Sequence, residues 1–343
     1  MDTDQLRATA VGFLGAFAVL AALLYLSGGV DTLVAELARA DTDTVLLVVA
    51  VTVCWLVAWG VALRTVLSVL GVKLSVVKSF FVFCGAMFSN NITPFGQAGG
   101  EPVAALLISR TADTEYERGL AAIASVDTLN FVPSVTLALI GAAYFATETT
   151  FGQRLRFATG VVVALAVVVP GLVYLGWQYR YRLEHKAVST FTPAVSRIAD
   201  FVPGVSAPDE AAIESRIGHF FGAIERVATN RRGLALSLAA STVGWGFQMV
   251  GLWLAFQAIG VTVPMHVLLF VVPMGAIAGV TPLPGGAGGI EAVLVAVLAA
   301  LPGIGITTST ALAAVVIYRG AVYWVPVAIG GVVVSVVGAD RLG

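Results

Sequence analysis

Five ionisable residues lie inside long apolar segments of the sequence and are the first candidates for chemistry. They are Arg64, Glu101, Asp127, Glu291 and Arg319. A charged side chain at the centre of a bilayer costs about 3 kcal/mol or more, so such residues usually face a protein interior or a water-filled path. The five residues therefore predict a polar site at membrane depth.

Glu101 and Glu291 each follow a Gly-Gly pair, in the stretches NNITPFGQAGGEP (90–102) and GVTPLPGGAGGIEA (279–292). A carboxylate at the start of a helix accepts free backbone N–H groups and offsets the helix dipole, so both residues could be simple N-caps. Two helix N-termini with open glycine backbone could also bind an anion such as a phosphate head group. The glycines concerned are Gly99, Gly100, Gly288 and Gly289.

A fixed carboxylate beside a phosphate site would repel the phosphate unless it is protonated or paired with a cation. Arg64 and Arg319 are the cations available at membrane depth. Asp127 and Arg319 also occupy equivalent positions when LAAIASV (120–126) is aligned with LAAVVIY (312–318). We therefore expect Asp127 and Arg319 to pair, either within the site or as an ion pair that holds two halves of the molecule in register.

Neutral polar side chains in the same apolar surroundings extend the candidate site. Asn90, Asn91 and Gln97 would each serve as interhelical hydrogen-bonding groups, and together they favour a polar interior cavity. The three histidines and two cysteines show neither metal-ligand spacing nor a nucleophile-base pattern. We therefore expect no metal, no cofactor, no catalytic residue and no enzymatic activity.

Composition assigns these residues to a membrane protein. Of 343 residues, 58% are hydrophobic and 11% are charged, and the mean hydropathy is +0.94, which is far outside the range of soluble domains. The net charge of −1 gives no indication of a nucleic-acid partner. The chain reads as one all-α transmembrane domain, 1–343, in the cell membrane.

Six apolar segments are long enough to span a bilayer, at 10–27, 44–71, 119–146, 157–178, 233–258 and 309–337. Two further apolar regions, 76–109 and 265–301, are broken by the glycine and proline stretches. Non-helical backbone at membrane depth needs protein or water around it, so each region either spans with an unwound centre or turns back as a re-entrant hairpin. Cytoplasmic loops of membrane proteins carry an excess of Lys and Arg, so the distribution of these residues distinguishes the two arrangements. If both regions are re-entrant and both termini are cytoplasmic, fourteen of the nineteen Lys and Arg residues lie on the cytoplasmic side, against eleven if both regions span. The count favours re-entrant hairpins.

The two broken regions are copies of each other. Thr93-Pro94 and Gly99-Gly100-Glu101 align with Thr281-Pro282 and Gly288-Gly289-Ile290-Glu291, and LGVKLS (70–75) aligns with IGVTVP (259–264). We therefore predict two inverted repeats of helix, re-entrant hairpin and helix, at 44–146 and 233–337, plus an N-terminal span and a linking span. Inverted repeats with breaks in corresponding positions are typical of membrane transporters.

Residues 179–232 form the one sizeable segment predicted outside the membrane, on the cytoplasmic side. Within it, Ile213, Ile217, Phe220, Ile224 and Val227 recur at helical spacing, which predicts an amphipathic helix. That helix could lie on an anionic lipid surface or pack against the helix bundle.

Three stretches resemble the signature regions of the flippase-like transmembrane family, the membrane module of lysylphosphatidylglycerol synthases and their stand-alone relatives. They are NITPFGQAGGEPVAALLISR, TPLPGGAGGIEAVL and AAVVIYRGAVYWVPVAIGG, and the resemblance covers about 44–337. The matching positions are Gly99, Gly100, Glu101, Pro282, Gly288, Gly289, Glu291 and Arg319. Ala104 stands where the family usually has arginine, and Asp127-Thr128 stands where it often has an acid followed by arginine.

The resemblance implies movement of a lipid across the bilayer. We expect the substrate to be an amphipathic lipid, either a phospholipid or a polyprenyl-phosphate carrier, whose head group passes between the two hairpins. A transporter of a small water-soluble solute is the alternative, and a membrane-embedded transferase or phosphatase acting on lipid head groups is a weaker one. The sequence leaves a homo-oligomer open.

Overall fold

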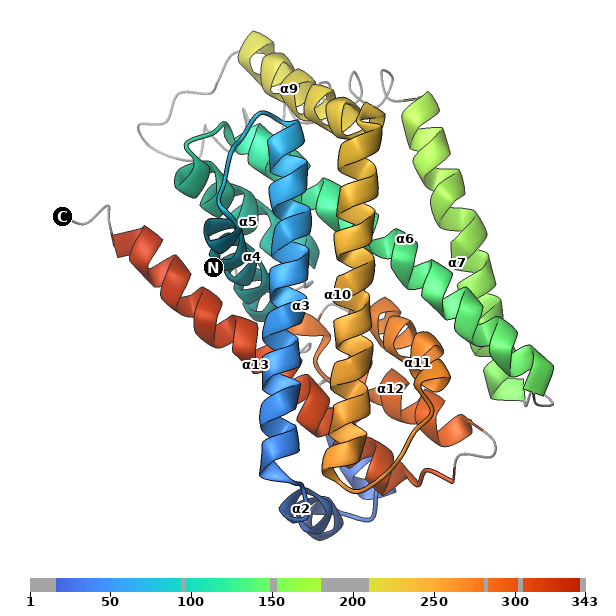
Figure 1. Cartoon of the computed structure of the whole chain (residues 1–343). Coiled ribbons are helices and arrows are strands. Elements are labelled where there is room, and N and C mark those ends of the chain that lie inside the picture. The colour runs from blue at the N-terminus through green and yellow to red at the C-terminus, as the bar shows by residue number, and fades with distance from the viewer. Residues whose placement is uncertain are drawn as a thin grey trace.

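The computed structural model describes residues 17–93, 97–148, 153–179, 210–280, 283–301 and 305–339, and all regular structure in these ranges is helical (Figure 1). Five helices are long and apolar enough to cross a membrane. They are α3 (Thr42–Val69), α6 (Tyr116–Glu148), α7 (Gln153–Gln178), α10 (Arg231–Ala258) and α13 (Thr308–Ala339). The expectation of an all-α, multi-pass membrane protein is confirmed.

Of the expected N-terminal span, 10–27, the structure describes the residues from Phe17 onward. A helix over Phe17–Leu26 and α2 (Val30–Ala38) are together apolar enough to span, but they meet at an angle of 77°. Gly28 and Gly29, with φ of 95° and 94°, make this bend, because side-chain-bearing residues rarely adopt that conformation. Residues 10–16 of the predicted span lie outside the described residues.

Four shorter helices form two packed pairs where the sequence predicts broken regions. The first pair is α4 (Val76–Ile92) with α5 (Gln97–Ala112), and the second is α11 (Met265–Ile277) with α12 (Gly289–Ala300). Two single 3₁₀ turns, η1 (Ala278–Val280) and η2 (Pro284–Gly286), lie between α11 and α12. In Figure 1 the α4–α5 pair lies in the upper half of the molecule and the α11–α12 pair in the lower half.

The segments that lead into the two pairs share one backbone geometry. After α3, the Val72 N–H donates to Leu67 O at 2.9 Å, and after α10 the Val261 N–H donates to Phe256 O at 3.0 Å. Each bond closes a Schellman cap around a glycine with positive φ, 84° at Gly71 and 74° at Gly260. The sequence match between LGVKLS and IGVTVP thus corresponds to the same helix ending.

Helices α3 and α10 lie side by side through the centre of the molecule (Figure 1). Their contact is close because Gly244 makes room for the indole of Trp59, whose Nε1 donates to Ser241 O at 3.3 Å. Trp59 also meets Trp245 edge to face, with ring centroids 5.7 Å apart. Around this centre, α13 packs on α4 and α6 packs on α11.

The predicted amphipathic helix is present as α9 (Glu210–Thr229), which lies across one end of the bundle (Figure 1). It packs on α6, burying Ile213, Ala223 and Val227. Arg216 reaches Glu117 at 3.4 Å at the start of α6. Of the two locations that the sequence left open, contact with the bundle is therefore the one observed. Residues 180–209 of the loop lie outside the described residues.

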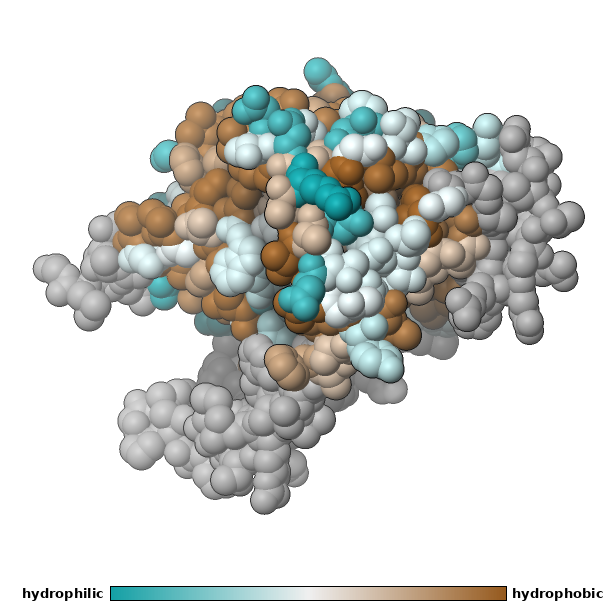
Figure 2. Space-filling view, turned by 90° about the horizontal axis from the view of Figure 1, so that it is seen from below, coloured by the Kyte–Doolittle hydropathy of each residue, from teal (hydrophilic) through white to brown (hydrophobic). Residues whose placement is uncertain are grey.

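The opposite end of the molecule carries both hydrophilic and hydrophobic residues. Figure 2 shows this end, where α2 lies, with hydrophilic residues gathered along the middle of the face and hydrophobic residues on either side.

Candidate functional site

A cavity of about 280 Å³ lies where the central helices meet the two pairs of short helices. Its wall combines amide, hydroxyl and charged groups with indole rings from α3 and α10. The polar lining residues are Asn90, Asn91, Asp127, Asn130, Ser134, Gln248, Tyr318 and Arg319, and the aromatic ones include Trp55, Trp59, Phe131 and Trp245. Polar groups therefore line part of this cavity, as the sequence favours, but most of its surface is apolar.

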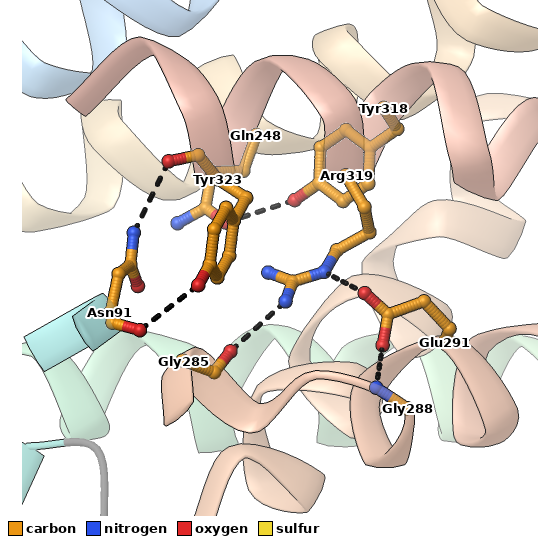
Figure 3. A network of polar contacts seen from close by, with 8 residues as sticks. All are labelled: Asn91, Gln248, Gly285, Gly288, Glu291, Tyr318, Arg319 and Tyr323. Carbon is orange, nitrogen blue, oxygen red and sulfur yellow. Dashed lines mark hydrogen bonds and ion pairs between the residues drawn. The ribbon is translucent and has the colours of Figure 1, made fainter. Parts of the chain in front are cut away.

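A buried ion pair in this wall joins Arg319 of α13 to Glu291 of α12 (Figure 3). The Arg319 Nε lies 2.7 Å from Glu291 Oε1, and its Nη2 donates to Gly285 O at 3.0 Å. Both side chains are largely buried, with 10% and 12% of their surfaces exposed. Glu291 Oε2 also accepts the N–H of Gly288 at 2.7 Å, so this carboxylate caps α12 and neutralises Arg319 at the same time.

The prediction that Arg319 forms an ion pair with Asp127 is wrong. Both residues line the cavity, but the ion pair that Arg319 forms is with Glu291. The reason is local packing. Helix α12 lies directly against α13, so the Glu291 carboxylate in the first turn of α12 contacts the Arg319 guanidinium. Among the described residues, Asp127 Oδ2 is buried without a hydrogen-bond partner.

The ends of the two short-helix pairs meet beside Arg319 (Figure 3). Asn91, near the end of α4, donates its Nδ2 to Tyr323 O at 3.3 Å, and the Tyr323 hydroxyl donates to Asn91 O at 3.0 Å. Gly285 of η2 lies against both residues, since an added Cβ there would be 2.6 Å from the Tyr323 ring and 2.9 Å from Asn91 Oδ1. The site is therefore closed on this side by three elements from distant parts of the chain.

Two further hydrogen bonds tie the cavity wall together across helices. The Tyr318 hydroxyl donates to Gln248 Oε1 at 2.9 Å, which joins α13 to α10 (Figure 3). The Trp245 Nε1 donates to Asn130 O at 2.9 Å, which joins α10 to α6. Inside a membrane such bonds hold helices in register.

The glycines of the second broken region do not offer the open anion site that the sequence suggested. The N–H of Gly288 is already bonded to Glu291, and Gly289 begins α12 directly behind it. The protein's own carboxylate thus occupies the N-terminus of α12, and an external phosphate would have to displace it.

Glu101 does not lie at the start of its helix. Helix α5 begins at Gln97, so Gly99, Gly100 and Glu101 fall within its first two turns, and the N-cap interpretation of Glu101 is wrong. A glutamate at the fifth position is beyond the free N–H groups of the helix start.

The Glu101 side chain is half-buried, and the structure records neither a hydrogen bond nor an ion pair for it within the described ranges. It does not line the cavity. The side chain of Gln97 lies outside the described residues.

Arg64 is also absent from the cavity wall. Its side chain is exposed, and its Nε donates to Leu74 O at 2.9 Å in the connection between α3 and α4. Arg64 therefore does not line the site as predicted. Its hydrogen bond instead holds the connection between α3 and α4 against α3. The error arose because Arg64 follows a long apolar run, yet it lies less than two turns from the end of α3.

Gly100 marks the closest approach of α4 and α5, and it supports a stability prediction. A Cβ added at Gly100 would clash with the Asn90 side chain and lie 2.6 Å from the Asn90 backbone nitrogen. We expect Gly100→Ala to lower the free energy of unfolding by about 1 to 3 kcal/mol, as overpacking does.

Gly246→Ala in α10 is the matched control, because no atom lies within 4 Å of its added Cβ. That control should be neutral or stabilising by about 1 kcal/mol in the same unfolding measurement. An unchanged stability of Gly100→Ala would contradict the observed packing.

The aromatic residues of the site were missed by sequence reasoning, which considered only charged and amide groups. Trp55 and Trp59 are four residues apart in the middle of α3, and Trp245 lies well inside α10. Tryptophans in membrane proteins concentrate at the two interfaces, so three of them at mid-span were a usable signal.

The chain is similar in sequence to known membrane proteins. Residues 10–330 match the family model described as the lysylphosphatidylglycerol synthase TM region. A UPF0104 membrane protein of Pyrococcus horikoshii is 24% identical over 313 residues, which cover 89% of this chain and 90% of the relative. A UPF0104 membrane protein of Methanothermobacter thermautotrophicus is 26% identical over 281 residues, which cover 80% and 78% of the two chains. Because the family model covers nearly the whole sequence, the chain belongs to the family of the lysylphosphatidylglycerol synthase transmembrane region.

Proposed function

We propose that this protein translocates an amphipathic lipid, a phospholipid or a polyprenyl-phosphate carrier, across the cell membrane without chemical change. The observation that supports the proposal is the cavity, whose polar lining residues lie among the five helices that are long and apolar enough to cross a membrane. A head group needs such surroundings to cross the hydrocarbon layer, because each unsatisfied polar group there costs several kcal/mol.

The cavity wall extends to the lipid-facing side of the molecule, which favours a lipid over a water-soluble solute. Leu165 of α7 is one of the lining residues. Helix α7 packs only loosely on the bundle, and of its apolar stretch Thr159–Gly176 just 6% is buried. A head group in the cavity could therefore keep its chains in the bilayer on the α7 side.

We further infer that the chain contains two inverted repeats, α3 to α6 and α10 to α13, with α4–α5 and α11–α12 as re-entrant hairpins. The helix contacts support this proposal because they occur in equivalent pairs. Helix α13 packs on α4 as α6 packs on α11, and α3 contacts α13 as α10 contacts α6. Alternating access would then arise from rocking of one repeat against the other, with the contacts among Asn91, Gly285 and Tyr323 separating as the site opens.

Cysteine labelling tests the re-entrant arrangement. In a background without Cys54 and Cys84, we expect Lys73→Cys and Arg110→Cys to react with a membrane-impermeant maleimide from the same side, the cytoplasm. All three labelling positions, Lys73, Arg110 and Thr262, are exposed. Thr262→Cys, before α11, should react from the opposite side and serves as the control. Labelling of the first two positions from opposite sides would show that α4 and α5 together span the membrane.

Lipid movement can be measured in reconstituted vesicles that carry a trace of fluorescent phospholipid. With active protein, dithionite added outside should bleach lipid that began in the inner leaflet. Ser134→Leu should slow this process, because Ser134 is buried in the cavity wall. Ser335→Leu makes the same change on an exposed face of α13 and should leave the rate unchanged. Absence of protein-dependent bleaching with both lipid classes would favour a water-soluble solute instead.

A further inference from the structure

Helix α2 lies across the end of the molecule opposite α9 and is only lightly packed (Figure 1). It contacts α13, yet none of its nine residues is buried. Val30 and Val34, one turn apart, keep 59% and 57% of their surfaces exposed. Apolar side chains gathered on the open side of a helix mark a surface for a protein or a membrane.

The depth of α2 is fixed by the ends of two long apolar helices. Asp41, three residues after α2, caps α3 by accepting the Thr44 N–H at 2.9 Å. The Asp41 N–H donates to the carbonyl of Ala258, the last residue of α10, at 2.8 Å. Helix α2 therefore ends at the level where α3 begins and α10 ends. Both α3 and α10 are long enough to cross a membrane, so this level is a membrane boundary.

The segment before α2 marks the same boundary. The apolar helix Phe17–Leu26 meets α2 at 77°, so a first helix that runs through the bilayer leaves α2 lying along the surface. Tyr25 and Leu26, next to the bend, are 83% and 67% exposed. Tyrosine is enriched at membrane–water interfaces, where its ring lies among the head groups.

One edge of α2 is apolar and continuous with its packed side. Leu33 and Leu37 are half-buried, and Leu33 packs on the core of the bundle. At helical spacing, Val30, Val34 and Ala38 form the stripe beside these two leucines, and all three are exposed. We call these three residues the apolar edge. The apolar surface of the bundle thus extends along α2 to this edge.

The other exposed edge of α2 carries charge. It consists of Asp31, Ala35 and Arg39, which we call the polar edge, and all three residues are exposed. A charged side chain at the centre of a bilayer costs about 3 kcal/mol or more, so the polar edge belongs in water. With Glu36, α2 and its C-cap Arg39 carry two acids and one base, which gives no net attraction to anionic lipid.

We propose that α2 binds the lipid surface at this end of the molecule and lies along it. The apolar edge inserts among the acyl chains just below the head groups, and the polar edge faces water. Contact with hydrocarbon drives this binding, so zwitterionic lipid is sufficient. Binding of α2 to the surface does not depend on lipid translocation.

Spin labels on adjacent exposed residues test this orientation. In a background without Cys54 and Cys84, Val34→Cys on the apolar edge and Ala35→Cys on the polar edge form a matched pair. The full-length protein is placed in phosphatidylcholine nanodiscs, and collisions with oxygen and with a water-soluble nickel complex are measured by power saturation. We expect oxygen to dominate at Val34→Cys, at a depth of about 5 to 10 Å, and nickel to dominate at Ala35→Cys.

Each other pattern of collisions would overturn the proposal. Nickel dominating at both positions would show that α2 lies in water. Oxygen dominating at both would show that α2 lies within the hydrocarbon as part of a broken span. Exclusion of both reagents at Val34→Cys, with dipolar broadening between labels, would show that a second copy of the chain covers the apolar edge.

A second pair of changes tests what holds α2 on the surface. With the label at Val30→Cys, Val34→Asp should move that label out of the lipid, so that nickel replaces oxygen as the dominant collision partner. Ala35→Asp is the matched control and should leave the label immersed. Equal effects of the two changes, or deeper immersion when phosphatidylglycerol replaces part of the phosphatidylcholine, would show that apolar contact does not drive the binding.

Discussion

Replacement of Arg319 by glutamine should lower the free energy of unfolding by about 3 to 5 kcal/mol, the largest structural effect that we expect of any single change. Arg319 and Glu291 form a buried pair at 2.7 Å, and removal of one partner leaves the other charge buried and uncompensated. The Gly285 carbonyl would lose its donor as well. Denaturation of the purified protein in mixed micelles, followed by tryptophan fluorescence, measures this loss.

The double change Arg319→Gln with Glu291→Gln provides the decisive comparison. Two neutral amides can still hydrogen-bond and leave no buried charge, so the double variant should recover much of the lost stability. Arg216→Gln is the control, because Arg216 pairs with Glu117 while 70% exposed, and exposed pairs contribute about 0 to 1 kcal/mol. If the single and double changes at the buried site are equally damaging, the pair does not stabilise the protein in the way that the geometry indicates.

The sequence predicted the elements of this fold well because their signals are local. Each span is a continuous apolar run, and each break contains glycine and proline, so neither depends on knowing the neighbours in space. The shared Gly71 and Gly260 caps were visible as a sequence match for the same reason.

Side-chain partners were predicted poorly because they depend on how the helices pack. Alignment of the repeats made Asp127 and Arg319 equivalent, but equivalence under a two-fold axis says nothing of the distance between them. The structure instead pairs Arg319 with Glu291, on the helix immediately before α13. Similarly, the Gly-Gly pair before Glu101 suggested a helix start at Glu101, whereas α5 begins four residues earlier at Gln97. Pro102 is thus the sixth residue of α5, beyond the four free N–H groups of the helix start, and it leaves the carbonyl of residue 98 without its usual helical hydrogen bond.

Glu101→Gln should leave stability nearly unchanged and yet slow lipid movement by about tenfold or more, which corresponds to about 1.4 kcal/mol in the barrier. The structure records no ion pair or hydrogen bond for Glu101 in the described ranges, and α5 does not use it as a cap, so an amide of the same shape has little to disrupt. Effects of about 0.5 kcal/mol on unfolding are typical of such sites.

The expected loss of transport follows from the position of Glu101 behind the cavity wall. Gly100, its neighbour, packs directly on Asn90, and Asn90 is one of the residues that line the cavity. A carboxyl group here can lose or gain a proton as the site changes sides, whereas glutamine cannot titrate. Glu115→Gln, on the exposed turn before α6, is the matched control and should move lipid at the unmodified rate. If Glu101→Gln also moves lipid at that rate, the charge of Glu101 has no part in translocation, and the polar path must rest on the cavity residues and the Arg319–Glu291 pair alone.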